Sequence, residues 1–466
     1  MTALWTSTEA EAATLGHANH AFEALGLSID TRSLKPGDLF VALKGDARDG
    51  HAFLRAAFDA KAAAALVARP ANDVSPRAPL LTVANTQRAL EDLARAARAR
   101  SRAKIVAVTG SVGKTTTKEI LRLALGALGT TSASTASYNN HWGVPLSLAL
   151  LPREVRFGVF EIGMNHFGEI RALVNLVRPD VALVTAIAPA HLEFFENCEA
   201  IADAKSEIFD GVVPGGYAII PSDSSYTERL AARARQAGLH RLLRFGEKGA
   251  SDARLLSFRE LDEGSLIEAD ILGQKYAFRA GAPGRHIAHN ALAALLAVAA
   301  LEGDVNAAAA SLAGFAPLKG RGSRFQANLA VGHAQIIDES YNANPVSMRA
   351  ALALLRSSLP AQGGRRIAIL GDMLELGTEA FALHASLSQD IEAARADLMF
   401  LCGPHMRALW DVLPPSRRGG YGETSTEIAP EIVAALRDGD VALVKGSFGS
   451  RMAVIIEALK ASTVGG

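Results

Sequence analysis

The chain has 466 residues, of which 49% are hydrophobic, and its 48 lysines and arginines balance 48 aspartates and glutamates. This length exceeds what one hydrophobic core supports and predicts two to four domains. A formal net charge of zero favours neither nucleic acid nor an anionic membrane as a partner.

The cysteines and the apolar runs predict the cellular compartment of the protein. The sequence contains two cysteines, Cys198 and Cys402, so no disulfide framework is expected and a reducing compartment is favoured. Glu9 and Glu11 stand where a signal peptide needs positive charge, and the longest apolar stretch, 291–301, is too short to span a bilayer. We expect a cytoplasmic protein without membrane insertion, and we expect a monomer.

Residues 1–85 predict a small α/β module. Its expected elements are strands at 40–43 and 63–67 and a helix over 52–61. Polar turns at 28–32 and 45–51 either bind a polar ligand or are ordinary turns. The candidate ligand-binding side chains are Ser28, Asp30 and Arg32.

The string VAVTGSVGKTTT at 106–117 predicts a phosphate-binding loop. A β-branched, apolar strand leads into glycines, and a helical pattern opens directly after them. In such a loop, backbone N–H groups and the helix N-terminus face an anion. The lysine reaches the β- and γ-phosphates of a nucleotide, and the next threonine ligates Mg²⁺. Val108 stands where the general pattern has its first glycine, and an ordinary turn between strand and helix is the alternative. We expect a nucleoside triphosphate held by Gly110, Ser111, Val112, Gly113, Lys114, Thr115 and Thr116.

Residues 86–316 alternate strands and helices, which predicts a parallel sheet wound with helices. The expected elements are strands at 157–162 and 181–187, helices from 168 and over 199–213, a β-meander over 252–280 and a helix from 285. Ligands of such sheets gather at the carboxyl ends of the strands. Glu161 ends one strand and offers a carboxylate to Mg²⁺. His191 follows the next strand, where a plain loop histidine is the alternative.

Residues 317–466 repeat this alternation without a second phosphate-binding loop, which predicts a Rossmann-like domain. Strands are expected at 335–337, 367–370, 399–402 and 441–444, each followed by a helix. The run PLKGRGSR at 317–324 is expected to be the hinge between the second and third domains. The predicted fold class is therefore α/β with three domains.

Several strings together resemble the Mur ligase family: TGSVGKTT (109–116), YNNHWGVP (138–145), EIGM (161–164) and AHLE (190–193). A first-domain string at 29–51 resembles the later members of that series. EIGMNHFGEI (161–170), ESYNANPVSM (339–348) and LGDMLELG (370–377) point to the last of them. The resemblance implies a UDP-sugar-binding domain at 1–85, a central ATP-binding P-loop domain at 86–316 and a C-terminal Rossmann-like domain at 317–466.

Mur ligases join amino acids or peptides to cell-wall precursors with ATP, and these strings imply UDP-N-acetylmuramoyl-tripeptide and D-alanyl-D-alanine as substrates. The resemblance implies that the tripeptide carboxylate attacks the γ-phosphate, which gives an acyl phosphate and ADP. The dipeptide amine then displaces phosphate. Because a carboxylate and a triphosphate repel each other, the site needs concentrated positive charge from Lys114 and Mg²⁺.

The resemblance also implies the metal ligands and the catalytic residues. Lys205 stands where several Mur ligases carry a carbamylated lysine, and a carbamate, unlike an ammonium, offers oxygen ligands to Mg²⁺. A surface lysine near Glu199 and Glu207 is the alternative. The implied catalytic residues are Lys114, His191 and Lys205, and the implied Mg²⁺ ligands are Thr115, Glu161, His191 and Lys205.

Nucleotide contacts are implied outside the loop as well. Asn290 matches a family asparagine that bonds adenine, whereas a second asparagine common in that motif is replaced here by Ile287. Arg321 or Arg324 would reach the phosphates from the hinge. Glu339, which is longer than the usual aspartate, would bond the ATP ribose.

The peptide substrates are implied to meet two asparagine-rich strings. Asn139 and Asn140 would contact the substrate. Residues of the third domain would face the dipeptide, namely Asn344, Pro345, Ser347 and Asp372. For each of these residues, turn chemistry is the alternative.

Three other functions compete with this hypothesis. A family member that adds a single amino acid would need a third-domain motif with an arginine, and the strings at 339–348 and 370–377 argue against it. Folylpolyglutamate synthase should lack the first-domain string. A nucleotide-gated binding module or a transporter ATPase needs one metal position, whereas Glu161, His191 and Lys205 supply several.

Overall fold

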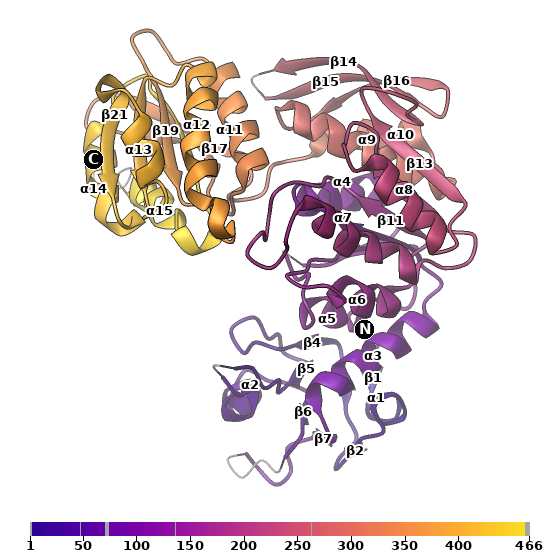
Figure 1. Ribbon diagram of the computed structural model, residues 1–466. Helices are drawn as coiled ribbons and strands as arrows, with labels where there is room; N and C mark the ends of the chain where they lie inside the picture. Colours follow the sequence, from indigo (N-terminus) through magenta and orange to yellow (C-terminus); the bar gives the residue numbers. More distant parts are fainter. Residues whose placement is uncertain (1, 47, 70–73, 136, 262, 462–466) are drawn as a thin grey trace.

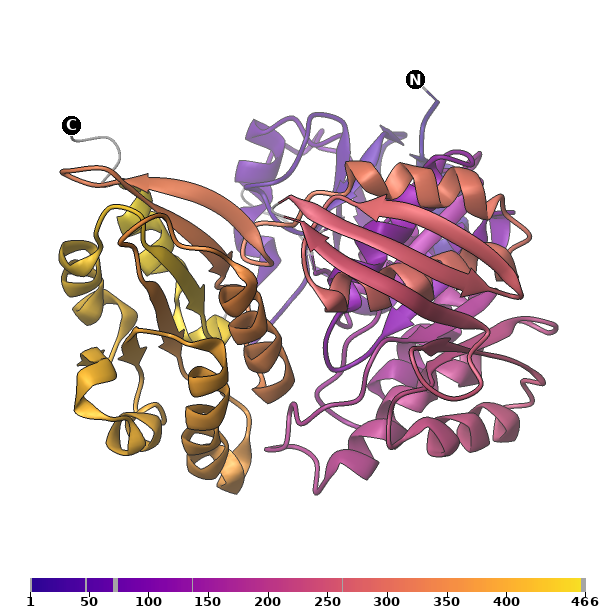
Figure 2. The same cartoon turned by 90° about the horizontal axis from the view of Figure 1, so that it is seen from above.

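The computed structural model describes residues 2–46, 48–69, 74–135, 137–261 and 263–461, so residue 47 of the turn expected at 45–51 lies outside the described residues. Three α/β domains follow one another along the chain (Figures 1 and 2). In Figure 1 the first domain lies at the bottom, the central domain above it, and the third domain beside the central one. Within the described ranges, every helix is too short or too polar to cross a membrane.

The first domain has a five-stranded sheet, ordered β2-β7-β6-β5-β4, in which β2 alone runs antiparallel. Helices cover both faces of this sheet. Strand residues alternate between the faces, so Leu39 and Leu66 pack under α1 and α3, whereas Phe40 and Val67 pack against α2. Its elements are β1 (Trp5–Thr6), α1 (Ser7–Thr14), β2 (His17–Ala18), β3 (Glu23–Ala24), β4 (Gly26–Ser28), β5 (Asp38–Val41), η1 (Gly50–Phe53), α2 (Leu54–Asp59), β6 (Ala64–Val67), β7 (Leu80–Thr82) and α3 (Thr86–Arg100).

The central domain has a nine-stranded sheet, ordered β16-β15-β14-β13-β12-β11-β8-β10-β9. Helices α4, α9 and α10 cover one face of this sheet, and α5 to α8 cover the other. Its elements are β8 (Lys104–Thr109), α4 (Lys114–Gly126), β9 (Thr131–Ala133), α5 (Gly143–Ala149), β10 (Phe157–Glu161), α6 (Glu169–Val177), β11 (Val181–Val184), α7 (Cys198–Ser206), η2 (Glu207–Gly211), β12 (Tyr217–Pro221), α8 (Thr227–Gln236), β13 (Arg241–Gly246), β14 (Ala253–Leu261), β15 (Gly264–Ile271), β16 (Gln274–Ala280), α9 (Arg285–Ala300), α10 (Val305–Ser311) and η3 (Leu312–Gly314).

The third domain has a six-stranded sheet, ordered β17-β18-β22-β19-β20-β21, which is parallel except for β17. Its elements are β17 (Ser323–Asn328), β18 (His333–Glu339), α11 (Pro345–Ser357), β19 (Arg366–Gly371), η4 (Gly377–Glu379), α12 (Ala380–Ala394), β20 (Leu398–Cys402), α13 (Arg407–Val412), η5 (Pro415–Arg417), β21 (Arg418–Gly422), α14 (Ser425–Ala435), β22 (Val441–Lys445), η6 (Phe448–Ser450) and α15 (Ala453–Ala461).

Most sequence-predicted elements are confirmed, and the differences are local. The helix expected over 199–213 is α7 followed by the 3₁₀ turn η2. The expected hinge is shorter than 317–324 because β17 begins at Ser323 and pairs with β18. Strand β21 was not predicted, since its sequence RGGYG carries neither alternation nor an apolar run.

The order of the central sheet positions the site. Strand β8 lies between β10 and β11, so the chain leaves β8 toward one edge and returns on both sides of it. At such a point the loops that follow neighbouring strands diverge and leave a crevice at the carboxyl ends of the strands. The loop after β8 and the ends of β10 and β11 therefore face the same space.

Candidate active site

The loop between β8 and α4 has the backbone of a phosphate cradle. Gly110 (φ 150°) and Gly113 (φ 83°) adopt conformations that favour glycine. A Cβ at Gly110 would collide with the Thr185 hydroxyl, and one at Gly113 would lie 2.8 Å from Asn290 Oδ1. The first amides of α4 lack partners within the helix and can bind an anion.

A cavity of about 810 Å³ lies in front of this loop, between the central and third domains. Such a volume suits a small-molecule substrate. Fourteen of the sequence-predicted site residues line it: Ser111, Val112, Gly113, Lys114, Thr115, Thr116, Asn139, Glu161, His191, Asn290, Arg321, Glu339, Asn344 and Ser347. The fold therefore brings together residues from three separate sequence regions that were predicted to share one site.

Lys114 is held against its own loop. Its Nζ donates to the Gly110 carbonyl oxygen at 2.7 Å. Burial lowers the pKa of Lys114, the Glu161 carboxylate opposes that shift, and Arg321 adds to it. The lysine thus stands at the phosphate cradle with an anion from the neighbouring strand and a cation from the linker close by.

Glu161 is a buried carboxylate with one free oxygen. It is 1% exposed, and its Oε1 accepts a 2.7 Å hydrogen bond from Asn139 Nδ2. Its Oε2 is buried and has no hydrogen-bond partner within the described part of the chain. An unpaired buried carboxylate oxygen is costly unless a cation binds it. Asn139 therefore orients Glu161, and the free oxygen fits a metal ion.

His191 is held by the third domain. It has a left-handed backbone (φ 61°), and its Nδ1 lies 2.6 Å from Glu375 Oε2. This hydrogen bond lowers the pKa of Glu375. The sequence did not predict Glu375, although the residue lies inside the LGDMLELG string.

Lys205 is a buried residue rather than a surface lysine. It is 1% exposed on α7, and burial together with Lys114 lowers its pKa well below the usual value. The two acidic neighbours of the surface hypothesis do not hold it: Glu207 instead accepts hydrogen bonds from the backbone N–H groups of Gly168 and Arg171. Lys205 is not among the residues that line the cavity.

Four predicted substrate contacts of the first and central domains are absent from the cavity lining. Asn140 Oδ1 accepts from the N–H groups of Trp142 and Gly143, which is turn chemistry. In the first domain, the Arg32 guanidinium pairs with Asp30, and Ser28 Oγ donates to the Asp30 carbonyl oxygen. Their roles in substrate binding stay predictions.

The two arginines of the expected hinge have different surroundings. Arg321 lines the cavity, where its guanidinium lies 4.0 Å from the centre of the Tyr341 ring. Arg324 instead donates to Ser358 Oγ at 3.3 Å inside the third domain. Of the two candidates, only Arg321 lines the cavity.

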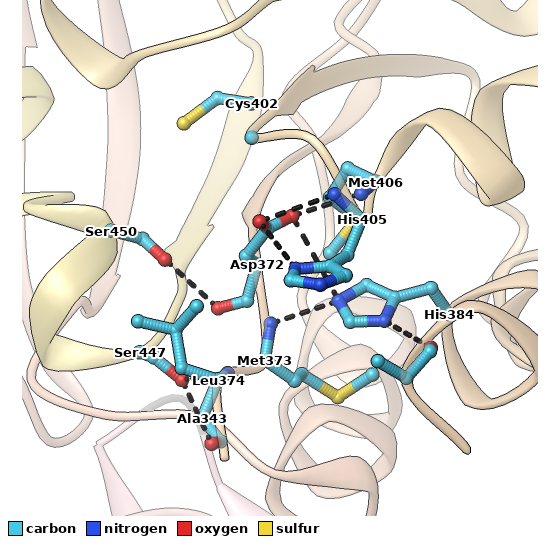
Figure 3. A network of polar contacts seen from close by, with 12 residues as sticks. Ala343, Asp372, Met373, Leu374, His384, Cys402, His405, Met406, Ser447 and Ser450 are labelled. Carbon is cyan, nitrogen blue, oxygen red and sulfur yellow. Dashed lines mark hydrogen bonds and ion pairs between the residues drawn. The ribbon is translucent and has the colours of Figure 1, made fainter. Parts of the chain in front are cut away.

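Asn344 and Asp372 make structural contacts. Asn344 lines the cavity, but its Oδ1 also caps α11 by accepting from the Ser347 N–H. Asp372, expected to face the dipeptide, is 2% exposed, and its oxygens accept from the N–H groups of His405 and Met406 and from the His405 ring (Figure 3). Asp372 is absent from the cavity lining, and its carboxylate holds the loop after β20, so the structure favours turn chemistry, the alternative stated for this residue.

Sequence reasoning missed several residues on the cavity lining. Lys445, the last residue of β22, is the one with the most unusual position, since it is a lysine with 2% exposure. Glu161 was predicted as a site residue because it is a charged residue at the carboxyl end of a buried strand. The same pattern would have predicted Lys445. Others are Ser137, Arg285, His286, His289 and Tyr341.

The phosphate cradle and the cavity that it shares with a Rossmann-like domain define a P-loop nucleotide-dependent enzyme. Family models match along the chain: residues 24–98 match "Mur ligase family, catalytic domain", 108–298 match "Mur ligase middle domain", and 323–448 match "Mur ligase, glutamate ligase domain". The chain belongs to the Mur ligase family.

Relatives extend over nearly the whole chain. A UDP-N-acetylmuramoyl-tripeptide–D-alanyl-D-alanine ligase of Rickettsia prowazekii is 32% identical, over 92% of this chain and 94% of the relative. Among solved structures, MurF from Acinetobacter baumannii is 29% identical with a TM-score of 0.85, covering 98% of this chain and 99% of that one. The MurF ligase from Thermotoga maritima, solved with ADP, is 25% identical with a TM-score of 0.78, covering 94% and 98%.

Proposed function

We propose that this enzyme joins D-alanyl-D-alanine to UDP-N-acetylmuramoyl-tripeptide with ATP, through an acyl phosphate. The observation that carries the proposal is the shared cavity, in which the P-loop and Glu161 face Arg321 and Glu339 across the domain boundary. The names of the aligned relatives support the choice of substrates. The proposal includes action in the cytoplasm as a monomer.

The reaction has two steps. The terminal carboxylate of the tripeptide attacks the γ-phosphorus of ATP, forming the acyl phosphate and releasing ADP. The free amine of D-alanyl-D-alanine then attacks the acyl carbon. The tetrahedral intermediate expels phosphate, and the amine loses its proton as the amide forms. Catalysis in this scheme is mostly positioning and charge stabilisation.

The residues of the cavity divide these tasks. Lys114 and the amides at the start of α4 would hold the β- and γ-phosphates, and Arg321 would approach them from the linker. Asn290, packed against the P-loop glycine, would bond adenine, and Glu339 would bond the ribose.

Mg²⁺ fits the site through Glu161 and Thr115. No cluster of three or more His, Cys, Asp or Glu side chains suited to a metal occurs in the described ranges. Mg²⁺ is commonly held by one or two protein oxygens together with phosphates and water, so such a cage is unnecessary. When bound, it would neutralise charge on the phosphates and the carboxylate. His191, through its second ring nitrogen, and a carbamate on Lys205 would extend this set.

The environment of Lys205 supports carbamylation. Carbon dioxide reacts with a neutral amine, forming an N–C bond and releasing one proton. Burial and the neighbouring Lys114 lower the pKa of Lys205, and both effects favour the neutral amine that this reaction requires.

The product identity tests the proposal. Purified protein, ATP, Mg²⁺ and the UDP-linked tripeptide should give a product heavier by one dehydrated dipeptide only when D-alanyl-D-alanine is present. D-Alanine alone and L-alanyl-L-alanine should be much poorer acceptors. An equally good reaction with a single amino acid would move the chain to another branch of the family.

A further inference from the structure

Lys445 stands at the carboxyl end of β22, on the third-domain wall of the cavity. Its side chain is 2% exposed, and its Nζ donates to the Asn342 carbonyl oxygen at 2.8 Å. Glu339 Oε2, its counter-ion, lies 3.4 Å away, which is long for a charge-assisted hydrogen bond. A lysine ammonium has three N–H donors, so this one keeps capacity for a further partner in the cavity that it lines.

Lys445 belongs to a row of cations that crosses the cavity. Lys114 stands on the central wall, Arg321 comes from the linker, and Lys445 stands on the third-domain wall. Burial lowers the pKa of both Lys114 and Lys445, and Arg321 adds to each shift, so Arg321 lies within electrostatic reach of both lysines. Glu161 acts on Lys114 and Glu339 pairs with Lys445, so the carboxylates compensate two of the three cations. In a partly desolvated cleft, the positive charge that remains favours binding of a further anion.

The other neighbours of Lys445 indicate which anion this is. Lys445 pairs with Glu339, and both residues share the cavity with His286, near the start of α9. Asn290, the predicted adenine contact, lies on the same helix, one turn beyond. Lys445 therefore lies within electrostatic reach of the start of α9, the helix whose Asn290 packs against the phosphate cradle.

We propose that Lys445 is a substrate-binding residue that contacts the phosphates of the nucleotide from the third domain. This inference rests on the proposed ATP-dependent function and adds a residue to the nucleotide site. Because the lysine belongs to one domain and the P-loop to another, the phosphate chain would join the two walls of the cavity. Nucleotide binding would then favour the docked arrangement of the third domain.

A purely structural role makes a different prediction. Lys445 also ties β22 to the turn after β18 through the Asn342 carbonyl. If this structural contact were the whole role of Lys445, replacing the lysine would lower the melting temperature and leave nucleotide affinity unchanged. If it instead held the carboxylate of the dipeptide, the Michaelis constant of the dipeptide would rise alone.

The test is a fluorescence titration of the full chain with labelled ADP, and competition with a non-hydrolysable ATP analogue, in Mg²⁺. Lys445→Met removes the charge at similar volume, and Lys445→Gln retains a donor for the turn. Loss of one charge-assisted phosphate contact should weaken binding of both nucleotides about tenfold or more in each variant. Lys319→Met is the matched control, because Lys319 is 72% exposed, pairs with Glu457 and carries the same charge.

Affinities within about twofold of the wild type in folded Lys445→Met or Lys445→Gln would overturn the proposal, whatever happens to the melting temperature or to the dipeptide. An equal loss of nucleotide affinity in Lys319→Met would also overturn the proposal, because the change in net charge alone would then explain the loss. The titrations contain no peptide substrate. A failure of peptide ligation in the wild type would therefore be distinguishable from a failure of this inference.

Discussion

At the scale of single residues, the site depends on side chains whose charge is only partly compensated by the protein. Glu161 has a buried oxygen without a partner in the described chain, Lys205 is a buried amine, and Lys114 folds back on its loop. The loop motif predicted Lys114, the end of a strand predicted Glu161, and the family resemblance implied a role for Lys205. The sequence could not predict Asn139 as the hydrogen-bond donor to Glu161, or the contact between His191 and Glu375, because these pairs form only when loops distant in sequence meet.

Lys114→Ala should abolish turnover and leave the fold intact. The substitution removes a charge directed at the phosphates and no packing of the core. Loss of a preorganised donor of this kind typically costs about 100- to 1,000-fold in rate. Phosphate release is the assay, and thermal unfolding is the control. Near wild-type phosphate release would remove the basis of the nucleotide assignment.

Lys205→Ala should be nearly inactive and partly restored by short carboxylic acids. The carboxylate would enter the vacated space and supply the oxygens that a carbamate provides. Lys205→Met is the matched control, because methionine fills the space and should block rescue. Full activity of Lys205→Ala at low Mg²⁺ would show that the lysine has no part in catalysis.

At the scale of elements, the polar contacts around Asp372 fix the carboxyl edge of the third sheet (Figure 3). The Asp372 carbonyl oxygen accepts from the N–H of Ser447 and from the Ser450 hydroxyl, and the Met373 N–H donates to His384 Nε2. Burial lowers the pKa of His384, which favours the neutral ring that this hydrogen bond requires. Loops after β19, β20 and β22 are thereby held together beside the cavity.

Strands and helices of this domain were largely predictable from apolar runs, whereas the role of Asp372 was not. A motif such as LGDMLELG shows that its residues matter, but it does not separate residues that touch substrate from those that hold loops. Asp372 and Glu375 illustrate the difference: one is engaged within its own domain, and the other reaches His191 of the central domain.

Asp372→Ala should destabilise the third domain. The variant leaves the buried N–H of Met406 without its acceptor, and the half-buried His405 loses two hydrogen bonds. A buried unsatisfied donor costs about 1–3 kcal/mol. Chemical denaturation should show a lower free energy of unfolding, while ADP affinity changes little. An unchanged free energy of unfolding, or a selective rise in the Michaelis constant of the dipeptide, would return Asp372 to the substrate site.

At the scale of the whole molecule, the cavity exists because the third domain lies against the central one. His191 meets Glu375 across the boundary, and Ser357 Oγ donates to Glu260 at 2.6 Å. The sequence predicted three domains and several of the residues on each wall, although it missed Lys445. It could not predict the docked geometry, which depends on contacts between residues 97 and 184 positions apart.

In the proposed reaction, ATP activates the carboxylate of the tripeptide. The most direct measurement uses UDP-linked tripeptide labelled with ¹⁸O in its terminal carboxylate, together with ATP, Mg²⁺ and D-alanyl-D-alanine. An acyl phosphate keeps one carboxylate oxygen as the bridge, and the amine expels phosphate with that oxygen attached. Mass analysis should therefore find one ¹⁸O atom in each phosphate released. Unlabelled phosphate would mean that water attacks ATP, and it would contradict the assignment as a ligase.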